Sequence, residues 1–318
     1  MTGAVTKRNA SNALGVLGIT LCGRVGMLYR KPKPSSGAVA PVKEEPITYD
    51  EDKSKFAIEF KAPAHKFHIV DPRPWPVMAS YAALEFLRGL VSRLHKVEFF
   101  LWKLGLFQLI TAGFLWCRDM VRESLLGFHS LRVEFGLRIG IKLFIVREIF
   151  FFLSFFWAYF HSALNPRVEL GRWPPYGVEP PRPYEIPLSN TILLLARGAY
   201  ITLAHEYILK GWKYCAILCL QITLFLGLTF TLLQIYEYKN CDFSISDSVY
   251  GRTFFLTTGF HGFHVIVGSI FIYIMIYRLI RGHFTPTRHF GFEARAWYWH
   301  FVDVVWLLLY IRMYWWVV

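Results

Sequence analysis

The chain has 318 residues, of which 54% are hydrophobic and only 18% are charged, whereas an ordinary soluble domain is about 25% charged. This apolar content excludes an intrinsically disordered protein, and five cysteines over the whole length exclude a small disulfide-stapled secreted fold. A formal net charge of +13 would indicate nucleic-acid binding in a soluble protein. In a membrane protein, the same charge indicates which side of the bilayer each loop occupies.

Long apolar segments predict membrane-spanning helices. Tyr214–Ile235 has 22 residues and Thr253–Tyr277 has 25, all without a formal charge, and about 20 apolar residues suffice to cross a bilayer. The segments are continuously apolar and do not alternate, which excludes a transmembrane barrel. We therefore predict an all-α, polytopic membrane protein. Its seven transmembrane helices are expected near residues 75–94, 97–117, 137–163, 189–209, 214–237, 252–278 and 296–317.

The first 64 residues differ from the rest of the chain in composition. Up to Lys43 they contain seven Lys or Arg and no acidic residue. This composition is typical of a mitochondrial transit segment, and the alternative, which we favour, is a polar basic extension retained on the inner side. Residues 65–318 form the predicted seven-helix domain.

Lys and Arg residues indicate the orientation of the chain. They are concentrated in the N-terminal segment and in the connections that would share its side of the membrane. The positive-inside rule therefore predicts an inner N-terminus and an outer C-terminus. Because these residues flank helix ends, we expect membrane lipids and no nucleic acid as their partner.

Ionisable residues inside the predicted spans are the candidate functional groups, because each is costly in hydrocarbon. Glu148 has only apolar neighbours three and four positions away on its own helix, and Arg147 projects about 100° around the helix, so neither supplies an obvious partner. Glu148 is either a proton-titrating or lipid-gating carboxyl, or a protonated carboxyl that makes one interhelical hydrogen bond.

Two pairs of residues have the three-residue spacing of one helix face. His261 and His264 could ligate metal or haem, but neighbouring glycines favour close helix packing with the histidines bonding across it. His300 and Asp303 could form an imidazole oriented by a carboxylate. We expect these four residues to be interhelical polar groups, and we expect no metal site.

Several strings occur in an order that resembles one membrane-protein family. They are HKFHIVDPRPWP (65–76), RDMVRES (118–124), Glu148 followed by FFWAYFH (155–161), WPP (173–175), SDSVYG (246–251), GFHGFHV (259–265) and FGFEARAWYWHFVDVVW (290–306). Together they resemble the cytochrome c oxidase subunit III family over about four-fifths of the chain.

This resemblance implies a core subunit of complex IV in the mitochondrial inner membrane, with a matrix N-terminus and a C-terminus in the intermembrane space. The family fold sets two helices apart from five across a V-shaped cleft that holds phospholipid of the phosphatidylglycerol, phosphatidylethanolamine or cardiolipin type. Haem and copper lie in the partner subunits I and II, and the isolated chain is not catalytic. The family stabilises the catalytic subunit and supports proton uptake during electron transport from cytochrome c to oxygen.

The resemblance also implies roles for individual residues. Glu148 corresponds to the family's buried carboxyl, and His161 is carried over as a further interhelical polar group. The expected lipid-binding residues are Arg122, Glu123, His129, Trp157, Arg281 and His283.

Basic residues depart from the family pattern in or beside the spans, at Arg147, Arg197, Arg252 and Arg295. We expect additional accessory subunits or cardiolipin to cover the faces that carry them. Two other functions stay open from the residues alone. One is a proton-coupled secondary transporter that uses Glu148, and the other is a haem-binding oxidoreductase that uses His261 or His264.

Overall fold

The computed structural model describes residues 67–97, 100–166 and 172–317. The chain divides into two units, Met1–Ala64 and His65–Val318, and every described residue lies in the second. The predicted transit segment or retained extension at 1–64 lies outside the described residues.

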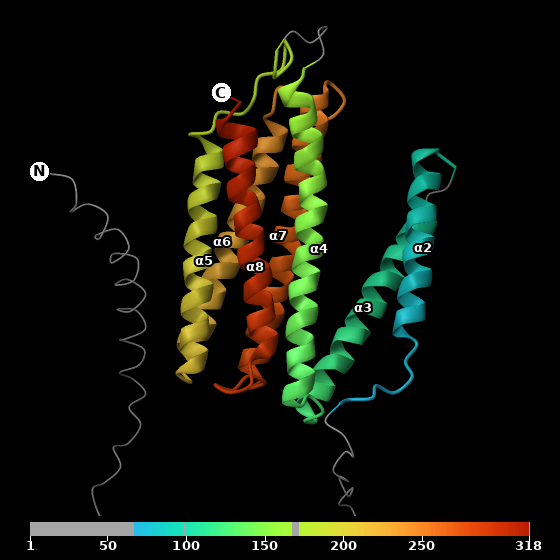
Figure 1. Ribbon diagram of the computed structural model, residues 1–318, viewed down its shortest axis with the longest axis vertical. Helices are drawn as coiled ribbons and strands as arrows, with labels where there is room; N and C mark the ends of the chain where they lie inside the picture. The colour runs from blue at the N-terminus through green and yellow to red at the C-terminus, as the bar shows by residue number, and fades with distance from the viewer. Residues whose placement is uncertain (1–66, 98–99, 167–171, 318) are drawn as a thin grey trace, which may run out of the picture. The chain divides into compact units, whose positions relative to one another are not determined.

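Seven α-helices make up the ordered framework of the described residues, which contain no strand. The helices are α2 (Trp75–Leu94), α3 (Leu101–Leu125), α4 (Leu131–Leu164), α5 (Ile186–Leu209), α6 (Lys213–Lys239), α7 (Val249–Ile280) and α8 (Phe290–Leu309), and a π-helical turn, η3 (Tyr310–Trp315), follows α8 (Figure 1). The prediction of an all-α fold with seven helices is confirmed. By length and composition, α3, α5, α6 and α7 are able to cross a membrane.

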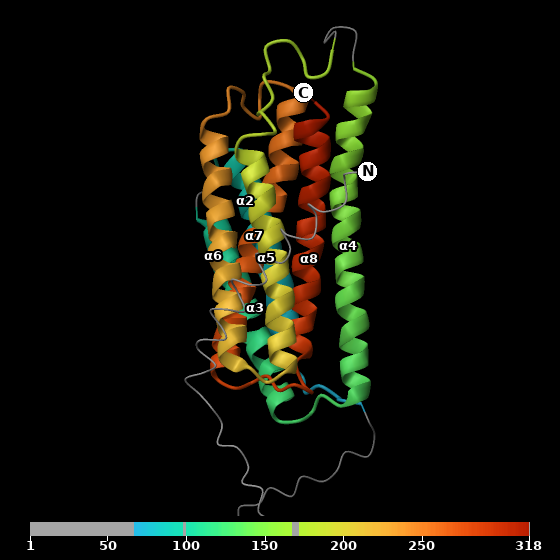
Figure 2. The same cartoon turned by 90° about the vertical axis from the view of Figure 1, so that its left-hand side faces the viewer.

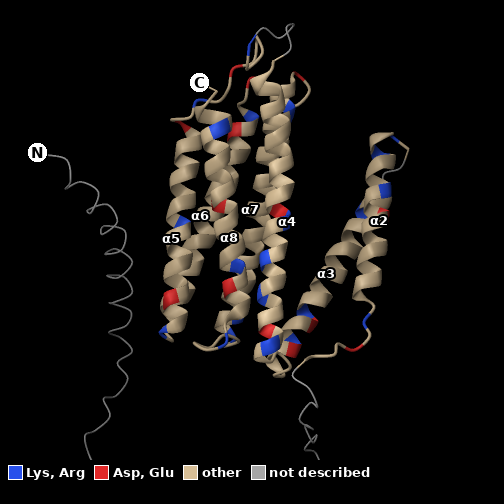
Figure 3. Ribbon diagram, in the orientation of Figure 1, with Lys and Arg blue, Asp and Glu red and all other residues tan. Residues whose placement is uncertain are grey.

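Two helices extend beyond their predicted ends. α3 continues to Leu125 instead of ending at residue 117, and α4 begins at Leu131 instead of residue 137. Hydropathy marks the part of a helix that lies in hydrocarbon, whereas backbone hydrogen bonding continues past it. The 34 residues of α4 span about 51 Å, well over the ~30 Å of a hydrocarbon core. Its charged residues accordingly lie between its first turn and its midpoint (Figure 3).

The last helix also differs from its prediction. It was expected at 296–317, but α8 begins at Phe290 and ends at Leu309, where the π-helical turn takes over. The hydropathy pattern does not distinguish π-helical from α-helical hydrogen bonding, since both bury the same apolar side chains.

The helices form two groups (Figures 1 and 2). α2 packs along α3, whereas α4 to α8 pack with one another. Within the second group, α8 contacts α4, α5 and α7, and α6 packs on α5 and α7. Its core is aromatic, as the fully buried Trp306 of α8 shows, with its ring 4.9 Å from the ring of Phe230 of α6.

Two glycines let the backbones of α2 and α3 touch. A Cβ added to Gly89 would lie 2.2 Å from the backbone nitrogen of Trp102, and one added to Gly105 would lie 2.4 Å from that of Phe86. Small residues at such crossings are a main source of helix association in membranes, because they allow close backbone packing.

We predict that Gly105→Ala forces α2 away from α3, because backbone atoms cannot yield to the added methyl group. Overpacking of this kind costs about 1–3 kcal/mol. The measurement is proteolysis of the connection between the two helices in native membranes, which the substitution should accelerate. Gly113→Ala is the matched control, since nothing lies within 4 Å of its Cβ position. Equal cleavage rates in the two variants would contradict the prediction.

Candidate functional site

Glu148 lies at the contact between α4 and α7, between the side chains of Arg147 and His264. It is 8% exposed and projects from α4 toward α7, where its Oε2 lies 3.0 Å from Nε2 of His264. The Arg147 guanidinium bends back to its other oxygen, with Nε 3.1 Å from Oε1. The expectation that Arg147 is no partner for Glu148 is therefore wrong, since the flexible Arg side chain spans the angle between adjacent helix positions.

The hydrogen bonds of His264 fix the number of protons at this site. Its Nδ1 lies 2.7 Å from the carbonyl oxygen of Phe260, which can only accept, so Nδ1 carries a proton. The contact between Nε2 and Glu148 then needs a second proton, held by either the imidazole or the carboxyl. Glu148 and His264 thus form an interhelical hydrogen-bonded pair, with one proton between Nε2 and Oε2.

A second buried pair joins α5 to α8. Arg197 is fully buried, and its Nη2 donates to Oδ1 of Asp303 at 2.9 Å. The guanidinium also lies 4.0 Å from the ring centroid of Trp299. The expectation that a further subunit or cardiolipin covers Arg197 is therefore wrong, because its partners are within the chain.

The predicted pairing of His300 with Asp303 is also not found, since Asp303 is bound by Arg197 and His300 is exposed. The sequence spacing places both on one helix but cannot show that Asp303 faces α5. His261 lies with Nε2 3.2 Å from the carbonyl oxygen of Val302 of α8. His161 is exposed near the end of α4.

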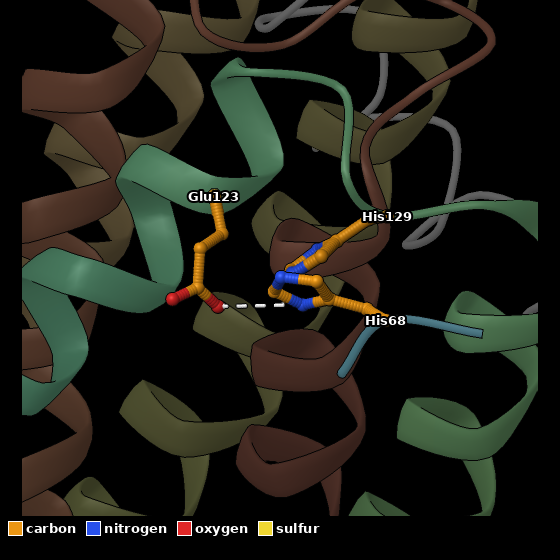
Figure 4. Close-up of side chains that lie close together, drawn as sticks. All are labelled: His68, Glu123 and His129. Atoms are coloured by element: carbon orange, nitrogen blue, oxygen red, sulfur yellow. Dashed lines mark ion pairs between the residues drawn. The ribbon is translucent and has the colours of Figure 1, made fainter. Parts of the chain in front are cut away.

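Figure 4 shows a polar cluster formed by His68, Glu123 and His129. His68 precedes α2, Glu123 is in the last turn of α3 and His129 is in the turn before α4, so three segments converge here. The distance from His68 Nδ1 to Glu123 Oε2 is 3.8 Å, and Arg73 forms an ion pair with the same carboxylate.

A cavity of about 240 Å³ opens beside this cluster. One wall is polar, formed by His68, Arg73, Glu123 and His129, and the rest is apolar. The apolar lining comprises Val70, Trp116, Met120, Val133 and Leu137. Burial, and then the neighbouring His68, lower the pKa of His129 from its ordinary value of 6.5. The cavity therefore has the combined polar and apolar lining that an amphiphilic ligand requires.

The other predicted lipid-binding residues lie outside this cavity. Arg122 is 64% exposed and lies 4.0 Å from Asp119, and Trp157 projects from α4 with 73% of its surface exposed. Arg281 directly follows α7 and lies over the ring of Tyr277, with His283 two residues later. Burial, and then Arg278 and Arg281, lower the pKa of His283.

Two comparisons place the chain among known proteins. The family described as Cytochrome c oxidase subunit III matches residues 65–318. The chain belongs to the cytochrome c oxidase subunit III family. A cytochrome c oxidase subunit 3 from Coturnix japonica is 52% identical over 255 residues, which are 80% of this chain and 98% of that protein. Those from Gallus gallus and Cyprinus carpio are 53% and 52% identical with the same coverage.

The resemblance deduced from the sequence strings is therefore confirmed. A subunit III is part of an oxidoreductase complex with other oxidase subunits, and the four apolar helices fit its membrane location. Sequence reasoning missed two members of the polar cluster, His68 and Arg73. Both occur in the string at 65–76, but nothing in a linear sequence indicates that this segment returns to the end of α3.

We predict that Arg197→Leu destabilises the five-helix group, because it leaves Asp303 buried without its cation. Removing one partner of a buried pair costs about 3–5 kcal/mol. The thermal unfolding midpoint of the purified oxidase should fall, and the double variant Arg197→Leu with Asp303→Leu should recover most of the loss. Arg182→Ala is the control, since the ion pair of Arg182 with Glu185 is exposed. If the unfolding midpoint of Arg197→Leu equalled that of Arg182→Ala, the result would contradict a stabilising role for the Arg197–Asp303 pair.

Proposed function

We propose that this chain is the non-redox core subunit of the respiratory cytochrome c oxidase, complex IV. In this role it stabilises the catalytic subunit, binds structural phospholipid and supports proton uptake. It lies in the mitochondrial inner membrane beside subunits I and II, with its N-terminus on the matrix side and its C-terminus in the intermembrane space. The observation that carries the proposal is the amphiphilic cavity between the end of α3 and the start of α4.

The composition of the cavity supports a phospholipid as its ligand. Arg73, His68 and His129 supply donors suited to a phosphate, and an Arg fork matches phosphate geometry. Glu123 supplies an acceptor for an amine or hydroxyl of the headgroup. A volume of about 240 Å³ holds part of a headgroup and leaves the acyl chains outside.

Exposed apolar side chains on the two neighbouring helices provide a surface for those acyl chains. α3 exposes Phe107, Ile110 and Phe114, and α4 exposes Leu143 and Trp157, each more than 60% exposed. Such surface lies in contact with lipid or with another subunit, because water would not solvate it favourably. The proposed lipids are phosphatidylglycerol, phosphatidylethanolamine or cardiolipin.

The shared proton of Glu148 and His264 supports the part of the proposal that concerns proton uptake. The pair lies on α4 and α7 within the bundle and holds a proton that either residue can carry. Redox chemistry is assigned to the haem and copper of subunits I and II. No described feature favours the alternative of a proton-coupled transporter, since α2 to α8 are each continuous helices.

We predict that Arg73→Gln releases phospholipid from the purified oxidase. Initial oxygen reduction should be close to wild type, while turnover-dependent inactivation should become severalfold faster. Lipid mass spectrometry and the decay of oxygen consumption measure the two effects. Arg122→Gln is the comparison, because Arg122 is exposed and does not line the cavity. If only the Arg122 variant lost lipid, the result would contradict the prediction and indicate that the headgroup binds outside the cavity.

We also predict that lipid retention increases as the pH falls. Burial lowers the pKa of His129 in the protein alone, and a bound phosphate would raise it again by favouring the imidazolium. Since the lipid-bound form takes up the proton more readily, lipid affinity should rise as the pH falls from about 8 to about 6. Detergent extraction at several pH values measures retention. In His129→Gln the pH dependence should disappear, and an unchanged dependence would exclude His129 from the headgroup site.

A further inference from the structure

A second cluster of metal-binding side chains joins α5 to α8. His205 is in the last turns of α5, His289 immediately precedes α8 and Glu293 is in its first turn. Each offers one ligand atom, and the three atoms lie within 4.8 Å of one another. This cluster shares no residue with the cavity beside α3.

His289 is oriented as metal-binding histidines are. Its Nδ1 lies 3.2 Å from the carbonyl oxygen of Thr285, and its Nε2 lies 3.2 Å from Oε1 of Glu293. The carbonyl only accepts, so it takes the Nδ1 proton, as in the outer shell of many metal sites. In a neutral imidazole, Nε2 would then direct its lone pair at a carboxylate oxygen. A cation between the two atoms, either a proton or a metal ion, removes the repulsion between the nitrogen lone pair and the carboxylate oxygen.

His205 adds a potential ligand atom that makes no hydrogen bond among the described residues. Its Nε2 is buried and has no hydrogen-bond partner among the described residues. The ring centroid is 5.2 Å from that of His289, and the ring stacks on Phe292 at 5.6 Å. A buried imidazole nitrogen without a partner costs free energy, and coordination to a metal would satisfy it.

Arg138 holds the remaining carboxylate oxygen. It forms an ion pair with Oε2 of Glu293, while Oε1 faces His289. The ion pair fixes the plane of the carboxylate and leaves Oε1 as a ligand. Arg138 is on α4, so a metal here would connect the ends of three helices.

We propose that His205, His289 and Glu293 bind a divalent transition metal of the zinc class. Two imidazole nitrogens and one carboxylate oxygen are a ligand set of zinc, with water in the fourth position, whereas Mg²⁺ and Ca²⁺ prefer oxygen ligands alone. Ligand atoms around tetrahedral zinc are about 3.3 Å apart. The contact between His289 and Glu293 already has this spacing, and the ligand atom of His205 lies within 4.8 Å of the other two. A metal bound at this site would link α5 to α8 at the end of the bundle where α4 begins.

The test is zinc stoichiometry in the purified oxidase complex. Wild-type complex is equilibrated with micromolar Zn²⁺, desalted and analysed for zinc per complex, beside the same preparation of His205→Phe. The phenylalanine keeps the stacking on Phe292 but has no nitrogen. We expect the variant to retain one equivalent less zinc than wild type. His300→Gln, which removes an exposed histidine from α8, should retain the wild-type amount.

Equal zinc content in wild type and His205→Phe would overturn the proposal. If that variant does not assemble, the decision rests on the wild-type complex alone, by anomalous scattering at the zinc edge. A peak between His205, His289 and Glu293 supports the site. Its absence at the same zinc concentration shows that the proton of a His289–Glu293 ion pair is the only cation there.

Discussion

The packing of the five-helix group depends most strongly on the buried ion pair between Arg197 and Asp303. Removing two charges from water costs several kcal/mol for each ion, and only good geometry recovers that cost. This geometry is reached when α5 and α8 place the two side chains at 2.9 Å and when Trp299 covers the guanidinium at 4.0 Å. A slip of α8 along α5 would leave both charges buried and unpaired, so the pair fixes the register of the two helices.

A glycine on α7 makes room for this arrangement, and a glycine on α6 lies beside it. A Cβ on Gly268 of α7 would lie 1.8 Å from the ring of Trp299, whereas one on Gly227 of α6 would be in ordinary van der Waals contact with the guanidinium of Arg197, at 3.5 Å. The indole therefore occupies the space that a side chain on α7 would fill. Four helices converge on one buried cation, which explains why α5 tolerates an arginine in the middle of an apolar span.

The sequence predicted the helices well because each contains a long, mostly apolar segment, which is most pronounced in α3, α5, α6 and α7. It predicted the end of α3 and the start of α4 poorly, since polar residues such as those at 118–124 are helical although they lack the apolar pattern of a span. Side-chain pairs between different helices were the features hardest to predict from the sequence. Glu148 could be singled out as a buried carboxyl, but its partner His264 lies 116 residues away and Arg197 lies 106 residues from Asp303. One-dimensional periodicity assigns a residue to a helix face without indicating which helix it meets.

The four unusual arginines divide by what compensates their charge. Arg147 and Arg197 have carboxylates within the chain, so neither charge requires a partner subunit. Arg295 donates to the carbonyl oxygen of Gly291 and lies over the ring of Phe271, but it has no carboxylate partner among the described residues. Arg252 is exposed near the start of α7, likewise without an ion pair in the described part of the chain. Any contribution of accessory subunits or anionic lipid to charge balance therefore concerns Arg252 and Arg295, at opposite ends of the bundle.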